Sequence, residues 1–334
     1  MTANEKLQDL LLERSLILER IKGSVSNDLT KVYDELLKNI SKRINESDLT
    51  IKESERLIKL LEKDLTIPYA ELGNDLNALA QDESKFMLNA VNAAAGIDIA
   101  TTLPTNKTIN KIANASLMEG ATIKNWFGSL EQSLRFDVAR EVRQSIIQGK
   151  TNREVTAALK AILNTSSRNA NTLALTGIAT VTNQVRQQTI KENEDIFKGQ
   201  KTVVTFDNRL SIICQSYSNS SWDMEGNILT GNKAFREPPY HMRCRTILLP
   251  IIKSFRELGI DIDEMKGAAK ASMDGQIPKD MSFDEWLKTK PKSFVESTLG
   301  KGRAELFLDD KINLSQLTDL RGNPLTIKKL VALK

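Results

Sequence analysis

The sequence has little cysteine, histidine or aromatic residue, and each shortage excludes a class of protein. Among 334 residues there are two cysteines and one histidine, so a disulfide framework is excluded and synthesis in a reducing cytoplasm is expected. Aromatic residues make up 5% of the chain. This low share, with abundant Leu, Ala, Lys and Glu, favours a mainly helical protein. No apolar run reaches membrane-spanning length, and the net charge of +4 is too small to indicate nucleic-acid binding by itself.

The scarce residues lie together in one stretch, residues 205–252. Cys214, His241 and Cys244 all fall within it. Both ends of the stretch are β-branched and apolar, whereas its middle is rich in Ser, Asn, Gly and Pro, which is typical of loops. We therefore predict a small β module at residues 199–253, in which a long loop returns to lie beside its own starting strand.

The same stretch carries a resemblance to a known family. In order, it contains Asp207-Asn208-Arg209, Ser211, Cys214, Pro238-Pro239-Tyr240-His241 and Cys244-Arg245. This order resembles the core of the phage head morphogenesis family, the minor head proteins similar to protein F of phage Mu. Members show a D-x-R-T-S-x-x-C turn and a P-P-x-H-x-x-C-R ending; Leu210 stands here where Thr is usual. The helix order before the turn and the short C-terminal segments are similar too, so the resemblance covers residues 120–334.

Helical periodicity predicts the rest of the fold, which we expect to be mainly α with a small β module (α+β). Residues 1–100 are predicted as a long N-terminal helical arm, because Leu and Ile recur there at spacings of three, four or seven, with a break expected near Gly23. Residues 101–198 are predicted as a helical body and residues 254–334 as a C-terminal region of short helices. A helix of the body is expected to stop at Gly149.

Capping signals predict where several helices begin. Thr151-Asn152-Arg153-Glu154 fits a capping box. A short helix is expected from there to Leu163, and another from Ser166 to about Asn193. In the C-terminal region, Ser282-Phe283-Asp284-Glu285 is a second capping box that predicts a further short helix.

The helical body has an excess of basic residues. From 135 to 191 there are nine Lys plus Arg and three Asp plus Glu. This block is either a face for DNA or an acidic partner, or a solvated face whose acidic partners come from elsewhere in the fold or from a neighbouring subunit. Without interleaved aromatic residues, contact with double-stranded DNA would be to phosphates and without sequence preference. The candidate DNA-contact residues are Arg135, Arg140, Arg143, Lys150, Arg153, Lys160, Arg168, Arg186 and Lys191.

One interpretation of the cysteines and the histidine is a structural zinc site. Two thiols and an imidazole are ligands that zinc favours, and His241 and Cys244 are close enough in sequence to reach a common ion with Cys214. Asp207 is the best candidate for the fourth ligand, with water or a residue of a partner as the alternatives. Pro238 and Pro239 are expected to stiffen the approach to the histidine.

Two other interpretations of the same residues stay open. In the first, no metal binds: the cysteines are buried, and Asp207, Arg209 and Arg245 stabilise the turn by pairing with one another. In the second, Cys214 is a nucleophile with His241 as its base and Asp207 as the orienting group. The sequence contains no oxyanion-hole or nucleophile-elbow signature to accompany such a triad.

The resemblance implies a structural virion protein that is not an enzyme. It would be a minor head or head morphogenesis protein at the portal vertex of a tailed phage, assembled in the host cytoplasm. The implied partners are the portal protein, the major capsid protein and further copies of the chain, and packaged or ejected DNA in some cases. The rival hypothesis is a metal-dependent hydrolase or nuclease that acts on DNA during genome entry.

Overall fold

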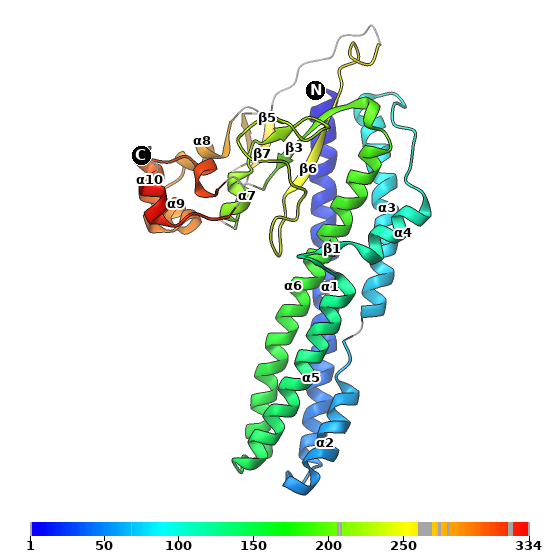
Figure 1. Ribbon diagram of the computed structural model, residues 1–334, viewed down its shortest axis with the longest axis vertical. Coiled ribbons are helices and arrows are strands. Elements are labelled where there is room, and N and C mark those ends of the chain that lie inside the picture. Colours follow the sequence, from blue (N-terminus) through cyan, green and yellow to red (C-terminus); the bar gives the residue numbers. More distant parts are fainter. Residues whose placement is uncertain are drawn as a thin grey trace. The chain divides into compact units, whose positions relative to one another are not determined.

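The fold is mainly helical with small antiparallel sheets, as predicted. The computed structural model describes residues 2–67, 69–205, 207, 209–259, 269–272, 275–278, 281–319 and 323–332. The chain divides into two compact units (Figure 1). The first unit comprises residues 1–14, 82–104 and 183–334, and the second comprises residues 15–81 and 105–182. The units therefore do not follow the predicted boundaries, because the predicted arm and body each contribute segments to both.

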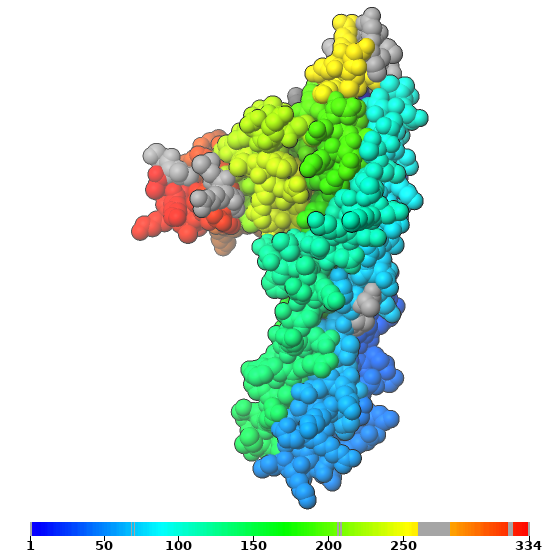
Figure 2. All heavy atoms as spheres, turned by 45° about the vertical axis from the view of Figure 1, so that its right-hand side comes forward, coloured from blue at the N-terminus to red at the C-terminus, as the bar shows by residue number. Residues whose placement is uncertain are grey.

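The second unit consists of helices and one small hairpin. Its elements are most of α1 (Ala3–Asn45), α2 (Ile51–Asp64), the first part of α3 (Tyr69–Ala95), α4 (Asn106–Ala115), β1 (Leu117–Met118), β2 (Ala121–Thr122), α5 (Ile123–Ile147) and most of α6 (Asn152–Lys191). Helix α5 buries an apolar stripe, with Leu134, Val138 and Val142 at most 2% exposed. Helix α2 lies along α5 (Figure 2), where Arg143 donates to both carboxylate oxygens of Glu55.

Helix α1 is continuous through Gly23, where a break was predicted. Gly23 lies on the exposed side of the helix, and a Cβ there would meet nothing within 4 Å. A glycine in an exposed helical position costs about 1 kcal/mol relative to alanine. Burial of Leu18 and Leu29 on either side stabilises the helix by about 1.5–3 kcal/mol each. The predicted break is therefore wrong because burial outweighs the glycine.

Helix α6 is also continuous, although two helices meeting near Ser166 were predicted. The hydroxyls that suggested an interruption find partners without breaking the helix. Thr165 Oγ1 donates to the carbonyl of Ala161 one turn earlier, at 3.1 Å. Ser166 Oγ shares a hydrogen bond of 2.8 Å with the hydroxyl of Tyr33 on α1. The contact with Tyr33 comes from a distant part of the chain, so local sequence signals could not reveal it.

The predicted helix ends and starts are confirmed where capping chemistry specified them. Gly149 follows α5 with φ of 66°, and its N–H donates to the carbonyl of Ile146. Two residues later α6 begins: the N–H of Glu154 donates to Thr151 Oγ1 at 3.3 Å, and the N–H of Thr151 donates to Glu154 Oε2 at 2.8 Å. The capping box at Ser282 is present as well.

A four-stranded antiparallel sheet organises the first unit. Its strand order is β5 (Ile228–Thr230), β4 (Ser221–Trp222), β3 (Phe197–Val203) and β6 (Ile247–Ile252), and β3 follows the short η1 (Glu194–Ile196). Strand β6 pairs with β3, with Val203 opposite Ile247, so the long loop does return to its starting strand as predicted. Leu248 faces one hydrophobic core, whereas Leu249 faces another core shared with α1, α3 and α6.

The C-terminal region packs on the β module and not apart from it. It contains the hairpin of β7 (Ala269–Ser272) and β8 (Gly275–Pro278), then α8 (Phe283–Lys288), α9 (Lys292–Leu299), α10 (Lys301–Leu308), η2 (Leu314–Leu317) and α11 (Ile327–Val331). Trp286 and Phe307 share one core with Tyr217, Trp222 and Tyr240 of the module. We predicted two separate regions here, residues 199–253 and 254–334. The shared aromatic core shows that they pack together.

Across the described ranges, no helix combines the length and the apolar character that crossing a membrane requires.

Candidate metal centre

Two short segments bring the candidate ligands together. After β3, Ser211 begins the one-and-a-half-turn helix α7 (Ile212–Ser216), and its hydroxyl accepts the N–H of Cys214 at 3.2 Å. Just before β6, the N–H of Cys244 donates to the carbonyl of His241 at 3.1 Å, which closes a tight turn. Arg243 in that turn adopts a left-handed φ of 61°. The pairing of β3 with β6 holds these two segments side by side.

The three predicted ligands meet in space. Cys214 Sγ lies 3.1 Å from His241 Nε2 and 3.5 Å from Cys244 Sγ, and the three ligand atoms all lie within 4.8 Å of one another. Two thiolates on a tetrahedral zinc ion, at about 2.3 Å each, are separated by about 3.8 Å. The observed spacing therefore fits a single small ion after a shift of a few tenths of an ångström.

The orientation of the imidazole suits a metal ligand. His241 Nδ1 lies 2.7 Å from the carbonyl oxygen of Met242. Because a carbonyl only accepts, Nδ1 carries the hydrogen, and Nε2 is the nitrogen that faces Cys214. A backbone carbonyl that fixes the ring through its other nitrogen is a common outer contact of metal-bound histidine.

The two thiols differ in their tendency to ionise. Hydrogen bonding with Cys214, assisted by His241, lowers the pKa of Cys244 to about 4, against the effect of burial. The same pairing, together with burial, raises the pKa of the Cys214 thiol. Hydrogen bonding to Cys244 raises the pKa of His241. Cys244 is therefore the first group to become a thiolate, the form that binds metal, in a site where both sulfurs are buried.

Asp207 is not a fourth ligand. Its carboxylate oxygens accept two hydrogen bonds from Arg245, both of 2.8 Å, and Oδ1 also accepts the N–H of Arg209 at 3.0 Å. Burial acts to raise the pKa of Asp207, but the bonds from Arg245 outweigh it and the pKa is lowered. The carboxylate lies outside the group formed by the cysteines and histidine. The prediction that it is a ligand is wrong, and the alternative prediction, pairing with Arg209 and Arg245, is confirmed.

The geometry does not favour the predicted catalytic arrangement of Cys214, His241 and Asp207. The sulfur of Cys214 does contact His241, but the ring nitrogen that an orienting carboxylate would hold is bonded to the Met242 carbonyl instead. Asp207 therefore does not orient the imidazole. With the pKa of Cys214 raised, the predicted nucleophile is also poorly ionised.

The segment before His241 is fixed mainly by an aromatic contact. The peptide bond between Pro238 and Pro239 is cis. Tyr240, 2% exposed, stacks on Tyr217 with ring centroids 4.3 Å apart. The predicted stiffening by the two prolines is thus accompanied by a packed tyrosine.

Ser211 belongs to the motif noted in the sequence, but the sequence reasoning gave it no role in the site. Its hydroxyl lies 2.7 Å from His241 Nε2 as well as accepting the N–H of Cys214. Its position three residues before Cys214, at the start of a short helix, was a usable signal, because serine is a favoured N-cap residue. Ser211 connects the cysteine and the histidine even without a metal.

The predicted basic block does not form one cationic face. Arg186 is 1% exposed and paired with Glu83, so the prediction that it contacts DNA is wrong. Four more cations of the block form ion pairs with acidic residues of the same chain: Arg135, Arg140, Arg143 and Lys150. Arg153, Lys160 and Arg168 are exposed in the second unit, and Lys191 is exposed in the first. Arg143 and Arg186 pair with acidic residues elsewhere in the fold, Glu55 and Glu83. The partners of Arg135, Arg140 and Lys150 are all on α5. The alternative of acidic partners elsewhere in the fold is therefore confirmed for two of the nine cations.

Comparison with family models, with curated proteins and with solved structures finds no match to this chain. The site is therefore interpreted from its own geometry.

Proposed function

We propose that this chain is a structural virion protein of a tailed phage, a minor head or head morphogenesis protein at the portal vertex, and not an enzyme. One observation supports the proposal: the residues that carry the resemblance form one connected cluster. Asp207 binds Arg245, 38 positions away, and Cys214 contacts His241 and Cys244. A chance match of residues along the sequence gives no reason for such convergence.

We further propose that Cys214, His241 and Cys244 hold a structural zinc ion. The donor set is the one zinc prefers. Because Nδ1 carries the hydrogen of the neutral ring, the lone pair of Nε2, the nitrogen that faces the sulfurs, can bind a metal. A structural ion would link α7 to the turn before β6 across 30 residues of chain. With Asp207 engaged by Arg245, the fourth position falls to water or to a residue of a partner.

The shared core gives this linkage a role in assembly. Helix α7 packs with η2, and Tyr217 and Trp222 lie in the same core as Trp286 and Phe307. Fixing α7 therefore fixes the C-terminal region too, and produces a rigid body suited to docking on a portal or capsid surface. Several copies would act together, because a portal is a ring of identical subunits.

A hydrolase or nuclease has less support. A water in the fourth position would also suit a catalytic zinc ion, but both sulfurs are buried, with Cys214 2% and Cys244 1% exposed, which leaves little room for a DNA substrate. The carboxylate of Asp207 is held by Arg245 and is not free to act as a general base.

Two measurements test the proposal separately. Immunogold labelling of purified phage particles with an antibody against this chain should mark a single vertex of the head; particles that lack the chain contradict the assignment. Elemental analysis of the purified protein should give one zinc per chain. A zinc content of zero in a chain that is present in particles contradicts the metal site alone.

A further inference from the structure

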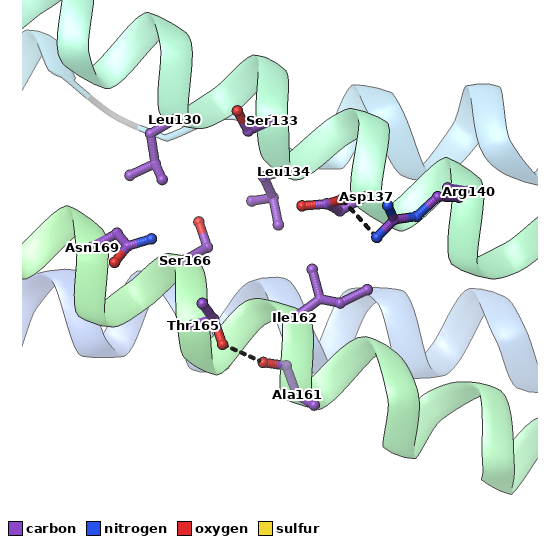
Figure 3. A pocket seen from close by; sticks show the side chains of 10 residues that line it. All are labelled: Leu130, Ser133, Leu134, Asp137, Arg140, Ala161, Ile162, Thr165, Ser166 and Asn169. Atoms are coloured by element: carbon purple, nitrogen blue, oxygen red, sulfur yellow. Dashed lines mark hydrogen bonds and ion pairs between the residues drawn. The ribbon is translucent and has the colours of Figure 1, made fainter.

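A groove opens between α5 and α6 in the second unit. It encloses about 320 Å³, and Figure 3 shows the side chains that line it. Leu130, Leu134 and Ile162 supply its apolar floor. Ser133 and Thr165 are small residues on its walls. Two neighbouring helices with small facing residues leave a space that neither fills.

One lining residue of the groove, Ser166, forms a hydrogen bond behind it. Ser166 bonds to the hydroxyl of Tyr33 on α1, at 2.8 Å, and is buried. Tyr33 is itself only 4% exposed, so α1 closes the back of the groove and leaves its front to solvent. The groove is thus formed by three helices that are already packed, and it does not depend on a loop.

The exposed rim is basic. Arg140 on α5 is part of the lining, and Arg168 on α6 contacts the lining residue Thr165; both side chains are exposed. The one acidic residue in the lining, Asp137, lies 2.9 Å from Arg140 and is neutralised by it. In the described part of the chain, Arg168 forms no ion pair, and its guanidinium donates to Thr165 Oγ1, a lining residue, at 3.3 Å.

A large exposed aromatic residue extends the apolar surface. Phe136 is 66% exposed, and the guanidinium of Arg140 lies over its ring, 5.7 Å from the centroid. Ile147, three turns further along α5, is 78% exposed. Phe136, Arg140 and Ile147 recur at helical spacing, so α5 presents a second, solvent-facing stripe beside the groove.

We propose that this groove binds an amphipathic α-helix of a partner protein whose apolar residues enter between α5 and α6 and whose acidic residues face Arg168. An apolar floor flanked by rows of side chains is the geometry of helix-in-groove recognition, and complementary charge selects an acidic partner. DNA fits less well, because phosphates gain nothing from Leu134, Ile162 or Phe136. The inference does not depend on the proposed virion role.

The first test compares three fluorescent probes by anisotropy with the full-length protein. The first is a helix-forming peptide of about 18 residues, five turns long, with Leu at helical spacing and Glu beside it. The second has Lys in place of every Glu, and the third is a double-stranded oligonucleotide. The Glu peptide is expected to bind about tenfold or more tightly than the Lys peptide. No binding of the Glu peptide, or equal binding of both peptides, overturns the proposal.

Variants locate the binding site. Ala161→Trp fills the groove from an exposed position on its wall and should abolish binding of the Glu peptide, while Arg168→Glu should weaken it about tenfold. Arg153→Glu, on the same helix but outside the lining, is the matched control and should bind as the wild type does. Circular dichroism verifies folding of each variant, and Arg168→Glu suffices if Ala161→Trp does not fold. If Arg168→Glu weakens the oligonucleotide and not the peptide, the rim is a DNA site and the proposal is wrong.

Discussion

Glu83 on α3 and Arg186 on α6 form an ion pair with both side chains buried, at 2.6 Å between Glu83 Oε1 and Arg186 Nη2. The second carboxylate oxygen, Oε2, accepts a hydrogen bond of 2.9 Å from Arg14 on α1. A single carboxylate thus joins three helices of the first unit. Because an uncompensated buried charge is far more unfavourable than a paired one, the pair is sensitive to loss of either member.

Glu83→Gln is expected to lower the free energy of unfolding by about 3–5 kcal/mol, because it leaves the Arg186 guanidinium buried without its counter-charge. The double variant Glu83→Leu with Arg186→Met removes both charges and should recover most of that loss. Urea denaturation of the wild type, Glu83→Leu, Arg186→Met and the double variant measures the coupling. Additive single effects would contradict the assignment of a buried pair.

Asp207→Asn is expected to destabilise the protein by about 2 kcal/mol at neutral pH, because two charge-assisted bonds to Arg245 are lost. The pKa of Asp207 is lowered in the folded state. Its stabilising contribution is therefore complete above the unfolded value of about 3.9 and is lost as the pH falls through the lower folded value. Thermal melts of both proteins from neutral to acid pH should converge at the acid end.

Arg209→Ala is the control for that experiment. The Arg209 side chain is 77% exposed and lies 3.5 Å from the same carboxylate. An exposed pair of this kind contributes less than about 1 kcal/mol. If Arg209→Ala and Asp207→Asn were equally destabilising, the Arg245 contact would not be the one that stabilises the turn.

Removal of metal should lower the melting temperature of the wild type and leave Cys214→Ser unchanged, because the variant has only two of the three ligands. Acid should release the ion as well, since the thiolates and the imidazole take up protons in its place. The measurement is differential scanning calorimetry with and without a chelator, alongside elemental analysis. Equal chelator effects on both proteins would show that any bound ion lies elsewhere.

Local chemistry predicted a good part of this structure. The stop at Gly149 and the start at Thr151 follow from groups within a few residues, so the sequence specifies them without the fold. The apolar, β-branched ends of residues 205–252 predicted that the long loop returns to its starting strand. The convergence of Cys214, His241 and Cys244 followed because scarce residue types of one chemistry lie in that same stretch.

Contacts between distant residues decided the rest. A carboxylate at a turn suits either a metal or an arginine, and only the position of Arg245 settles the role of Asp207. The serine at position 166 resembles a helix start until Tyr33, 133 residues away, satisfies its hydroxyl. Hydrophobic periodicity predicts which face of a helix is buried. It does not predict which hydrophobic core that face packs against. The division of α1, α3 and α6 between two units was therefore beyond the sequence pattern.

Replacement of the buried Lys233 should destabilise the protein. The side chain of Lys233 is 1% exposed, and Nζ donates to the carbonyls of Thr318 and Asp319, both at 3.0 Å, so it ties the β module to the C-terminal region. Lys233→Met keeps the length of the side chain but leaves both carbonyls without this donor, and is expected to cost about 1–3 kcal/mol. Lys301→Met, at an exposed position on α10, should change stability by less than about 0.5 kcal/mol.

The pH dependence of the same variant has a definite sign. Burial lowers the pKa of Lys233 in the folded state. Between that lowered value and the unfolded value of about 10.4, the unfolded chain binds more protons, so the wild type gains stability relative to Lys233→Met as the pH rises. Hydrogen exchange at residues 314–319 in both proteins, at neutral and alkaline pH, measures the effect where the lysine acts. Protection that is the same in the variant and the wild type at both pH values would mean that the aromatic core alone holds the C-terminal region in place.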